Sequence, residues 1–417
     1  MKTQHTSMFK SLSISVLSLF SALFLNAQEV SDAVSMSPNY AEQIFYSLQN
    51  GEVASVPLTE WDLAITADAF DAAVFVNDHL GIEVYEYLGE VSDFETLDTT
   101  GQLSARLFNS DLDWFNGALN RPETLTPSPF DYGWGEYNVI THVVTGTRIF
   151  IVSNPVGETY KFMIESLDLG EYTIRYALLD GSGEQVVNAN TSDFAGKNFW
   201  YLDLETASVQ DLEPLSADWD ITFTRYTSEL LPGFQYLLTG ALQNKGVLAA
   251  RAADIVPDDA VWTDYELIAD KNVIGYDWKN FNMDIFQWEI IGNLSYFVED
   301  QAGQVWHIVF TGFGGAGTGD IEFTKEIVGQ VTSLEEAVAL NWSMFPNPTA
   351  GELTVQLPEG FDAAQWSLID MSGRTIEAGQ FLNGGAQSLV FERHSAGLYF
   401  LQLTDGEILV QERLVIR

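Results

Sequence analysis

The sequence holds few residues of the types and spacings that carry out chemistry. Its 417 residues include no cysteine and five histidines, which removes thiolate nucleophiles and cysteine-ligated metal sites. No G-x-S-x-G elbow, H-E-x-x-H zinc motif, P-loop or EF-hand spacing occurs. The 59 acidic residues offer many carboxylate pairs to a hydrolase, but no spacing singles one pair out. We therefore expect no enzymatic activity.

Two motifs suggest binding sites but have simpler explanations. "GFGGAG" (312–317) satisfies the G-x-G-x-x-G expression of nucleotide-binding loops. No helical pattern follows it to offer an N-terminus to a phosphate, so it is better interpreted as a turn between strands. Asp111 and Asp113 of "NSDLDWFN" could share a calcium ion, but that cation takes about six to eight oxygens. A solvated acidic loop is the favoured interpretation.

The composition indicates an exported protein. Lys2 and Lys10 precede the apolar run "SLSISVLSLFSALFL", which is typical of a signal peptide over residues 1–28. This run is shorter than the roughly 18 apolar residues of a membrane span, and no later segment reaches that length. Without residues 1–28 the chain keeps 16 basic and 59 acidic residues, a net charge of −43, which disfavours nucleic acid and anionic lipid as partners. We expect secretion or display on the outer cell surface, via the periplasm, without a transmembrane segment.

The chain also contains an internal repeat. Three segments recur in the same order: "PLTEWDLAIT" (57–66) as "PLSADWDITFT" (214–224), "WGEYN" (134–138) as "WKNFN" (278–282), and "IFIVSNPVGETYKFMI" (149–164) as "YFVEDQAGQVWHIVF" (296–310). Several matches in register over more than 100 residues indicate two homologous modules. In both modules the apolar residues alternate with polar ones, for example Trp306, Ile308 and Phe310, as expected of antiparallel strands.

The predicted fold is all-β, with two tandem antiparallel modules and a small C-terminal β-sandwich. A change in charge density near residue 343 marks the second boundary. The predicted segments are a signal peptide (1–28), module one (29–180), a flexible Gly/Ser/Asn-rich linker (181–196), module two (197–330), a linker with a short helix (331–344) and the C-terminal domain (345–417). The helix prediction rests on a capping box of Ser333 and Glu336.

The two modules resemble the HmuY-type haem-binding family of exported bacterial β-proteins. The resemblance lies in the Trp-Asp strands, "WDLAIT" (61–66) and "WDITFTRY" (219–226), and in the late hairpins that contain "ETYKFMI" (158–164) and "QVWHIVF" (304–310). It implies haem as the ligand, held by two side chains that are usually histidines. The histidine candidates are His79, in the turn "VNDHLG", and His142, whereas His307 aligns with Lys161 and is expected on the polar face of its strand. Met163 and Met283 are expected to fill space rather than bind iron.

The C-terminal domain resembles the sorting domain of type IX secretion cargo. The residues that carry the resemblance, in order, are Phe345, Pro346, Asn347, Pro348, Gly351, Asp370, Gly373, Arg374, Gly397 and Tyr399. About seven short strands are expected in this domain. The resemblance implies the type IX machinery of the outer membrane as a partner. We interpret Pro346 and Pro348 as a stiff lead-in that separates the domain from the cargo.

These observations predict an exported, non-enzymatic binding protein. Haem or a similar ligand is what the resemblance of the modules implies. The alternative is a surface adhesion protein whose modules bind protein or glycan without haem.

Overall fold

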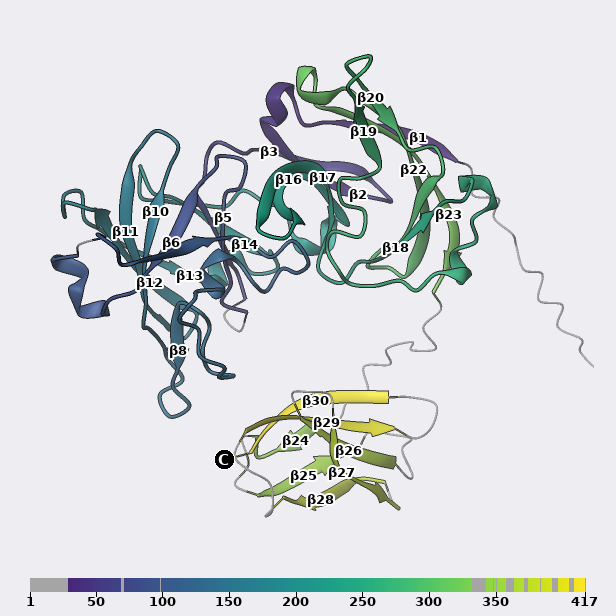
Figure 1. Cartoon of the computed structure of the whole chain (residues 1–417). Coiled ribbons are helices and arrows are strands. Elements are labelled where there is room, and N and C mark those ends of the chain that lie inside the picture. The colour runs from purple at the N-terminus through teal and green to yellow at the C-terminus, as the bar shows by residue number, and fades with distance from the viewer. Residues whose placement is uncertain are drawn as a thin grey trace, which may run out of the picture. The chain divides into compact units, whose positions relative to one another are not determined.

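The protein is built from strands joined by turns and short 3-10 helices (Figure 1). The computed structural model describes residues 29–331 and 343–416, except 69, 70, 98, 348, 350, 358–363, 371–373, 383, 392–396 and 405–408. The predicted all-β fold is confirmed over these residues. The chain divides into two compact units after Gln330. The predicted signal peptide (1–28) and helix (333–342) lie outside the described residues.

The first unit contains two lobes, each with a large and a small antiparallel sheet. In the first lobe the large sheet has the order β13-β12-β11-β10-β6-β7, and the small sheet has the order β15-β14-β4-β5. Strands β8 and β9 form a hairpin that extends the large sheet, because β9 also pairs with β11. The strands are β4 (Leu63–Thr66), β5 (Val74–Val76), β6 (Glu83–Tyr87), β7 (Leu103–Leu107), β8 (Gly135–Tyr137), β9 (Val144–Gly146), β10 (Ile149–Ser153), β11 (Thr159–Asp168), β12 (Glu171–Leu178), β13 (Gln185–Asn190), β14 (Phe199–Asp203) and β15 (Ser208–Gln210).

The second lobe repeats this strand order. Its large sheet has the order β1-β23-β22-β21-β18, its small sheet has the order β3-β2-β16-β17, and β19 and β20 form a separate hairpin. The strands are β1 (Val30–Ser35), β2 (Glu42–Ser47), β3 (Gly51–Pro57), β16 (Ile221–Leu231), β17 (Phe234–Gln243), β18 (Leu248–Ala253), β19 (Lys279–Asn282), β20 (Gln287–Ile290), β21 (Leu294–Glu299), β22 (Gln304–Phe313) and β23 (Asp320–Gln330). The shared order is what a duplicated sequence requires.

The two lobes exchange strands: β1, β2 and β3 of the first repeat belong to the second lobe, and β14 and β15 of the second repeat, together with β13 before them, belong to the first lobe. Strands β1 and β2 of the first repeat pair with β23 and β16 of the second, with Val30 opposite Lys325 and Phe45 opposite Thr222. In return, β14 of the second repeat pairs with β4 of the first, with Tyr201 opposite Ala64. Each lobe is therefore assembled from both repeats, and the predicted boundaries 29–180 and 197–330 separate the repeats in the sequence but not the lobes in space.

The predicted flexible linker, 181–196, is corrected by the structure. It contains β13, which pairs with β12 over six residues, from Glu171 opposite Asn190 to Tyr176 opposite Gln185. Val187 and Ala189 of this strand are buried in the core of the first lobe. Two apolar residues at a spacing of two are a weak signal for a strand. The small polar residues around them favour a linker instead.

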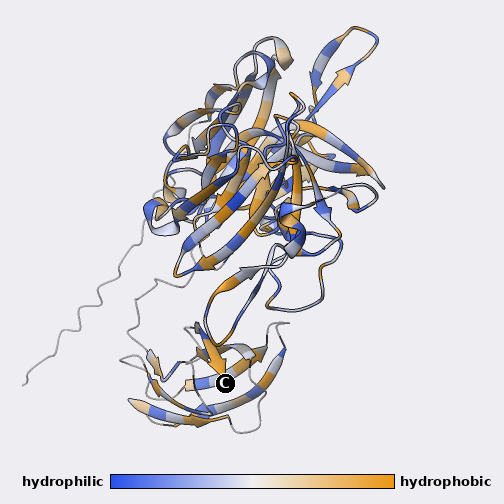
Figure 2. Cartoon of the chain, turned by 90° about the vertical axis from the view of Figure 1, so that its left-hand side faces the viewer, coloured by the Kyte–Doolittle hydropathy of each residue, from blue (hydrophilic) through white to orange (hydrophobic). Residues whose placement is uncertain are grey.

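Apolar and polar residues interleave along the strands (Figure 2). The buried apolar side chains form one large core in each lobe. Tyr160, Phe162 and Ile164 of β11 point into the core of the first lobe. The predicted inward set of β22, Trp306, Ile308 and Phe310, packs in the second core together with Trp278. Gly312 and Phe313 of "GFGGAG" end strand β22, and the remaining four residues turn towards β23, which confirms that this motif connects two strands.

The second unit is a small sandwich of a three-stranded and a four-stranded sheet, with the orders β24-β25-β28 and β27-β26-β29-β30. Its strands are β24 (Ser343–Phe345), β25 (Glu352–Gln356), β26 (Ala364–Asp370), β27 (Thr375–Phe381), β28 (Ala386–Val390), β29 (Gly397–Thr404) and β30 (Leu409–Ile416). Leu353, Val355, Leu368, Leu401 and Leu414 are among the side chains of its core. The described residues thus contain the strand number that the sequence predicts.

The predicted lead-in at the start of this unit is corrected. Phe345 lies in β24, opposite Thr354 of β25. The side-chain amide of Asn347 donates to the carbonyl of Arg413 at 2.7 Å, and its oxygen accepts from the backbone N–H of Val415 at 2.9 Å. Asn347 therefore bonds to a backbone carbonyl and a backbone N–H of β30, as a neighbouring strand would. This segment is thus part of the sandwich and not a spacer before it.

Candidate functional site

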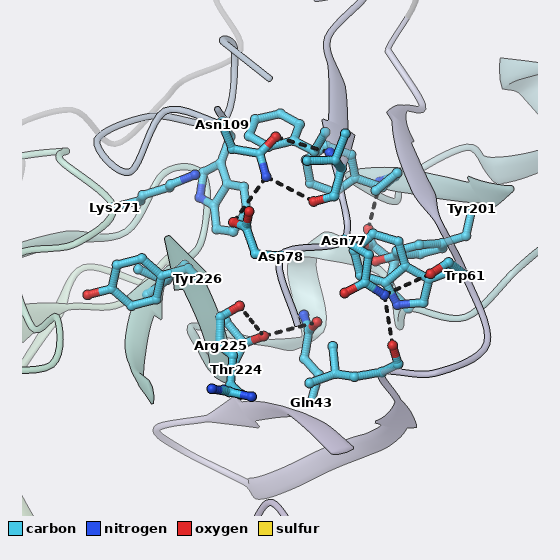
Figure 3. Close-up of a pocket in the computed structure, with 18 of the residues that line it drawn as sticks. Gln43, Trp61, Asn77, Asp78, Asn109, Tyr201, Thr224, Arg225, Tyr226 and Lys271 are labelled. Carbon is cyan, nitrogen blue, oxygen red and sulfur yellow. Dashed lines mark hydrogen bonds between the residues drawn. The ribbon is translucent and has the colours of Figure 1, made fainter. Parts of the chain in front are cut away.

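A pocket of about 80 Å³ lies where the two lobes meet (Figure 3). Its aromatic walls come from both repeats and consist of Phe45, Trp61, Phe75, Trp114, Phe199, Tyr201, Trp219 and Tyr226. Trp61 packs edge to face on Tyr201 with the ring centroids 5.1 Å apart, and Phe45 packs in the same way on Trp219 at 5.0 Å. Because such contacts fix the orientation of the rings, the walls are preformed.

The Trp-Asp dipeptides build the two sides of this pocket. Asp62 accepts from the backbone N–H of Leu204 at 2.8 Å, and Asp220 accepts from that of Leu48 at 2.7 Å. In each case the aspartate of one repeat holds the residue that directly follows a strand of the other repeat, β14 or β2. Burial raises the pKa of Asp62 to about 6 and also raises the pKa of Asp220. Trp61 and Trp219 are buried, as expected for core anchors.

Two asparagines complete these corners. The amide of Asn77 donates to the carbonyls of Leu58 and Trp61, both at 2.7 Å. The amide of Asn244 donates in the same way to the carbonyls of Ser216 and Trp219, at 2.7 and 2.8 Å. In both repeats an asparagine directly follows a strand, β5 or β17. This recurrence is a signal in the sequence that the three recurring segments do not contain.

Asp78 and Asn109 form the polar wall of the pocket (Figure 3). The Asp78 carboxylate accepts from the Asn109 amide and from the backbone N–H of Thr227, each at 3.1 Å. Asn109 in turn donates to the carbonyl of Val76 at 2.9 Å and accepts from its N–H at 3.0 Å. Burial raises the pKa of Asp78, although these donors oppose the shift.

Lys271 places an ammonium group in the pocket. Its backbone is fixed between the lobes, because its N–H donates to the carbonyl of Leu112 at 2.8 Å and its carbonyl accepts from Gln243 at 2.7 Å. The residue is 4% exposed, and Nζ lies 4.2 Å from the ring centre of Trp114 and 4.9 Å from that of Phe75. Within the described part of the chain, Nζ has no hydrogen-bond acceptor or ion-pair partner. Burial lowers the pKa of Lys271 to about 8.

Glu213 is the second buried carboxylate of the pocket. It accepts from the backbone N–H groups of Asn198 and Phe199 and from the hydroxyl of Tyr201 at 3.0 Å. Burial nevertheless raises its pKa to about 7. Its hydrogen bonds assign it to holding β14, so it has a structural explanation that needs no reaction.

The carboxylates of Asp111 and Asp113, whose charges act on Lys271, accept hydrogen bonds from groups of the protein itself. Asp113 accepts from Ser110 at 2.8 Å and from the N–H groups of Phe115 and Asn116, both at 2.8 Å. Asp111 accepts from the hydroxyl of Ser228 in the other lobe. No group of three or more His, Asp or Glu side chains that could hold a metal occurs among the described residues. The two aspartates close a loop and join the lobes.

The structure does not bring His79 and His142 together. His79 follows β5 and is half-buried, and among the described residues its Nδ1 has no hydrogen-bond partner. Burial and the charge of Arg225 lower the pKa of His79. His142 is exposed in the β8–β9 hairpin, where Nδ1 lies 2.7 Å from the hydroxyl of Tyr137. Figure 1 shows this hairpin at the end of the lobe away from β5. Neither histidine lines the pocket.

His307 corrects the expectation of a polar-face residue. It is buried and stacks on Phe297 with the ring centroids 4.8 Å apart, and Nδ1 lies 3.5 Å from Glu326. Lys161, its counterpart in the first repeat, is also buried and donates to the carbonyl of Phe94 at 2.6 Å. Segments outside the sheets cover this face in both lobes, which strand periodicity alone does not reveal.

Each lobe also carries a projecting hairpin with the same turn. Asn138 accepts from the N–H of Ile140 and Asn282 accepts from that of Asp284, both at 2.9 Å. His142 and Phe286 have positive φ angles, 62° and 54°. The tips are apolar and exposed, with Ile140 85% and Phe286 73% exposed. Exposed apolar side chains gathered on a projection are typical of interaction surfaces.

The sorting-motif residues have structural positions where the structure describes them. Gly351 is buried between β24 and β25 with a φ of 123°, a conformation that favours glycine. Tyr399 of β29 packs against the core, opposite Leu414. Asp370 ends β26, Arg374 is exposed before β27 and Gly397 begins β29. Pro346 follows β24, whereas Pro348 and Gly373 lie outside the described residues.

Comparison with known proteins defines the second unit and leaves the first open. No curated protein matches the chain. A solved structure described as a biofilm associated protein, BSP domain, is similar with 10% identity and a TM-score of 0.16, over 94% of this chain and 63% of that chain. This TM-score is too low to support an argument about fold or function. In the described part of the chain, no helix has the length and apolar character to cross a membrane.

The family model of the secretion system C-terminal sorting domain matches residues 343–417. This confirms the sorting-domain prediction, on the unit that the structure shows as a small sandwich. The C-terminal unit is thus a type IX sorting domain, and the protein is exported across the outer membrane to the cell surface or beyond.

Proposed function

We propose that the protein is an exported, non-catalytic binding protein whose pocket between the lobes holds a small organic group. The observation that carries this proposal is Lys271, a buried residue whose ammonium lies in an aromatic pocket without a hydrogen-bond acceptor among the residues that the structure describes. A buried charge that lacks a hydrogen-bond partner costs free energy, which an acceptor atom of a ligand would recover. Few convergent polar groups among aromatic walls are typical of small-ligand sites.

The hydrogen bonds of the two pocket carboxylates support a role without catalysis. Asp78 and Glu213 both accept from backbone N–H groups of strands that they hold in place. A general base must instead reach a substrate proton. We infer that these carboxylates shape the pocket and that binding, not turnover, is its function.

The tryptophan fluorescence of the mature protein tests this proposal. Trp61, Trp114 and Trp219 line the pocket, so a ligand that enters it should shift their emission and raise the melting temperature. A panel of sugars, carboxylates, amines and haemin should contain at least one saturable ligand. Trp114→Phe should reduce the emission change, whereas Trp288→Phe, in the β19–β20 hairpin, should leave it intact. No saturable response to any member at millimolar concentration would contradict the proposal.

Haem binding stays a prediction, and the same panel tests it. The residues that the resemblance implies, His79 and His142, lie on different elements, and the pocket of about 80 Å³ is smaller than the cavity of about 150 Å³ that encloses a benzene molecule, whereas haem is much larger than benzene. A Soret band that sharpens with haemin and is lost in His79→Ala or His142→Ala would support haem despite this geometry.

The paired hairpins favour a second function, attachment to a partner protein. The tips of the hairpins are apolar. The lysine among the described residues of the hairpins, Lys279, is buried at the start of β19. A protein groove with an apolar floor and a basic rim would complement them and the net charge of −41. Beads coated with the mature protein should adhere to some members of a panel of purified extracellular proteins. Adhesion that is unchanged in Ile140→Asn/Phe286→Asn would exclude the hairpins.

A further inference from the structure

We propose that the pocket recognises a neutral, hydroxyl-bearing ring, namely one terminal sugar residue of a glycan, and that Lys271 donates a hydrogen bond to one of its hydroxyl oxygens. This inference rests on the proposed function and names the ligand class of the same pocket.

The walls offer aromatic carbon to one side of a sugar ring. Trp114 and Phe199 pack with their ring centroids 5.7 Å apart and their planes at 60°, and Phe75 lies edge to face on Phe199 at 5.4 Å, so the Lys271 ammonium is bordered by a cluster of aromatic rings. The C–H groups of a sugar pack against aromatic carbon, while its hydroxyls need donors and acceptors. Lys271 supplies the donor that no described protein group uses.

The size of the pocket favours a terminal residue. A cavity of about 150 Å³ encloses a benzene molecule, whereas this one measures about 80 Å³. It therefore admits the edge of one ring with one or two hydroxyls, and the remainder of the ligand stays outside. An internal residue of a chain, with substituents on both sides, would not present such an edge.

The charges around Lys271 select against acidic ligands. Three carboxylates, Asp113, Asp78 and Asp111, act on its ammonium, and Glu213 also lines the pocket. Figure 3 shows the other cation of the lining, Arg225, directed away from Lys271, and its guanidinium lies 5.5 Å from the ring centre of Tyr40. A carboxylate on the ligand would meet more negative than positive charge, whereas a hydroxyl accepts from the ammonium without that repulsion.

Calorimetric titration of the full mature protein with matched sugar pairs tests the inference. The probes are the methyl glycosides of glucose, galactose and mannose, and the corresponding uronic acids. At least one neutral glycoside should bind, and its uronic acid should bind at least tenfold more weakly. Equal or tighter binding of the uronic acid would overturn the inference, as would the failure of every neutral glycoside to bind.

Variants and pH isolate the contribution of Lys271. Lys271→Met should weaken the neutral glycoside at least tenfold, whereas Lys161→Met, which removes a buried lysine outside the pocket, should not change its affinity. In the wild-type protein the affinity should fall as the pH rises above about 8, where Lys271 loses its proton. This second measurement does not depend on the folding of a variant, and an affinity that stays constant from pH 7 to 9.5 would overturn the role of Lys271. Binding of a non-sugar ligand alone would reject this inference and retain the proposed function, whereas no binding of any ligand would reject both.

Discussion

At the scale of the residue, Glu213 links the pocket to the pH dependence of stability. Burial raises its pKa from 4.5 to about 7 in the folded protein, so the folded state binds this proton more tightly than the unfolded state. The stabilisation from the protonated group is complete below about pH 4.5 and is lost as the pH rises towards 7. A shift of this size corresponds to about 3 kcal/mol.

We predict that Glu213→Gln removes this loss. The glutamine oxygen can accept from the N–H groups of Asn198 and Phe199, and the Tyr201 hydroxyl can reverse its role and accept from the new amide. Urea denaturation between pH 4.5 and 8 should show the variant gaining about 3 kcal/mol relative to the wild-type protein as the pH rises. The exposed Glu60→Gln serves as the control. Parallel pH profiles of wild type and Glu213→Gln would refute this assignment.

Single residues also mark the limit of what the sequence could predict about the site. Trp61 and Trp219 were identifiable as core anchors because both stand before an alternating strand in each repeat. Lys271 was not, because its importance depends on contacts with Leu112, 159 residues away in the chain, and with the ring of Trp114. His79 and His142 are predicted as ligands from the chemistry of the imidazole group alone, and the fold places them on different elements.

At the scale of the element, period-two patterns predicted the inward faces of the long strands but not the short or irregular pairings. β11 and β22 have ten residues each, so their alternation is well sampled. β13 has six residues and polar neighbours, so its sequence predicts a linker in place of a strand. Asn347 acts on β30 from 66 residues away, through a side chain in place of a strand, and no local pattern signals such a contact.

The hairpins show what a repeat adds to the interpretation of an element. The turns at Asn138 and Asn282 have the same hydrogen bond, and the positive φ angles fall four residues later in both, although the tip residues differ. Backbone geometry is thus shared while side chains vary. Two related attachment points that contact different parts of one partner would share their backbone geometry and differ in their side chains in this way. Ile140 and Phe286 are therefore tested together.

At the scale of the whole molecule, the exchange of strands was not predictable from the repeat. The order of segments along the chain is identical whether β1–β3 complete their own repeat or the other one. As a consequence of the exchange, neither repeat can complete a core alone. Ile44 and Tyr46 of the first repeat lie in the core of the second lobe. Trp200 and Leu202 of the second repeat lie in the core of the first lobe.

This arrangement predicts a crossed response to core mutations. Ile44→Ala and Leu202→Ala each remove a fully buried side chain, at a cost of about 2–5 kcal/mol. Ile44→Ala, although it lies in the first repeat, should raise amide hydrogen exchange first in β22 and β23, whereas Leu202→Ala should raise it first in β11 and β12. Because local openings report the stability of the surrounding unit, exchange resolved by peptide distinguishes the lobes. If Ile44→Ala instead loosened β11 and β12 and spared β22, the strands would complete their own repeat, and the pocket shared between the repeats would lose its foundation.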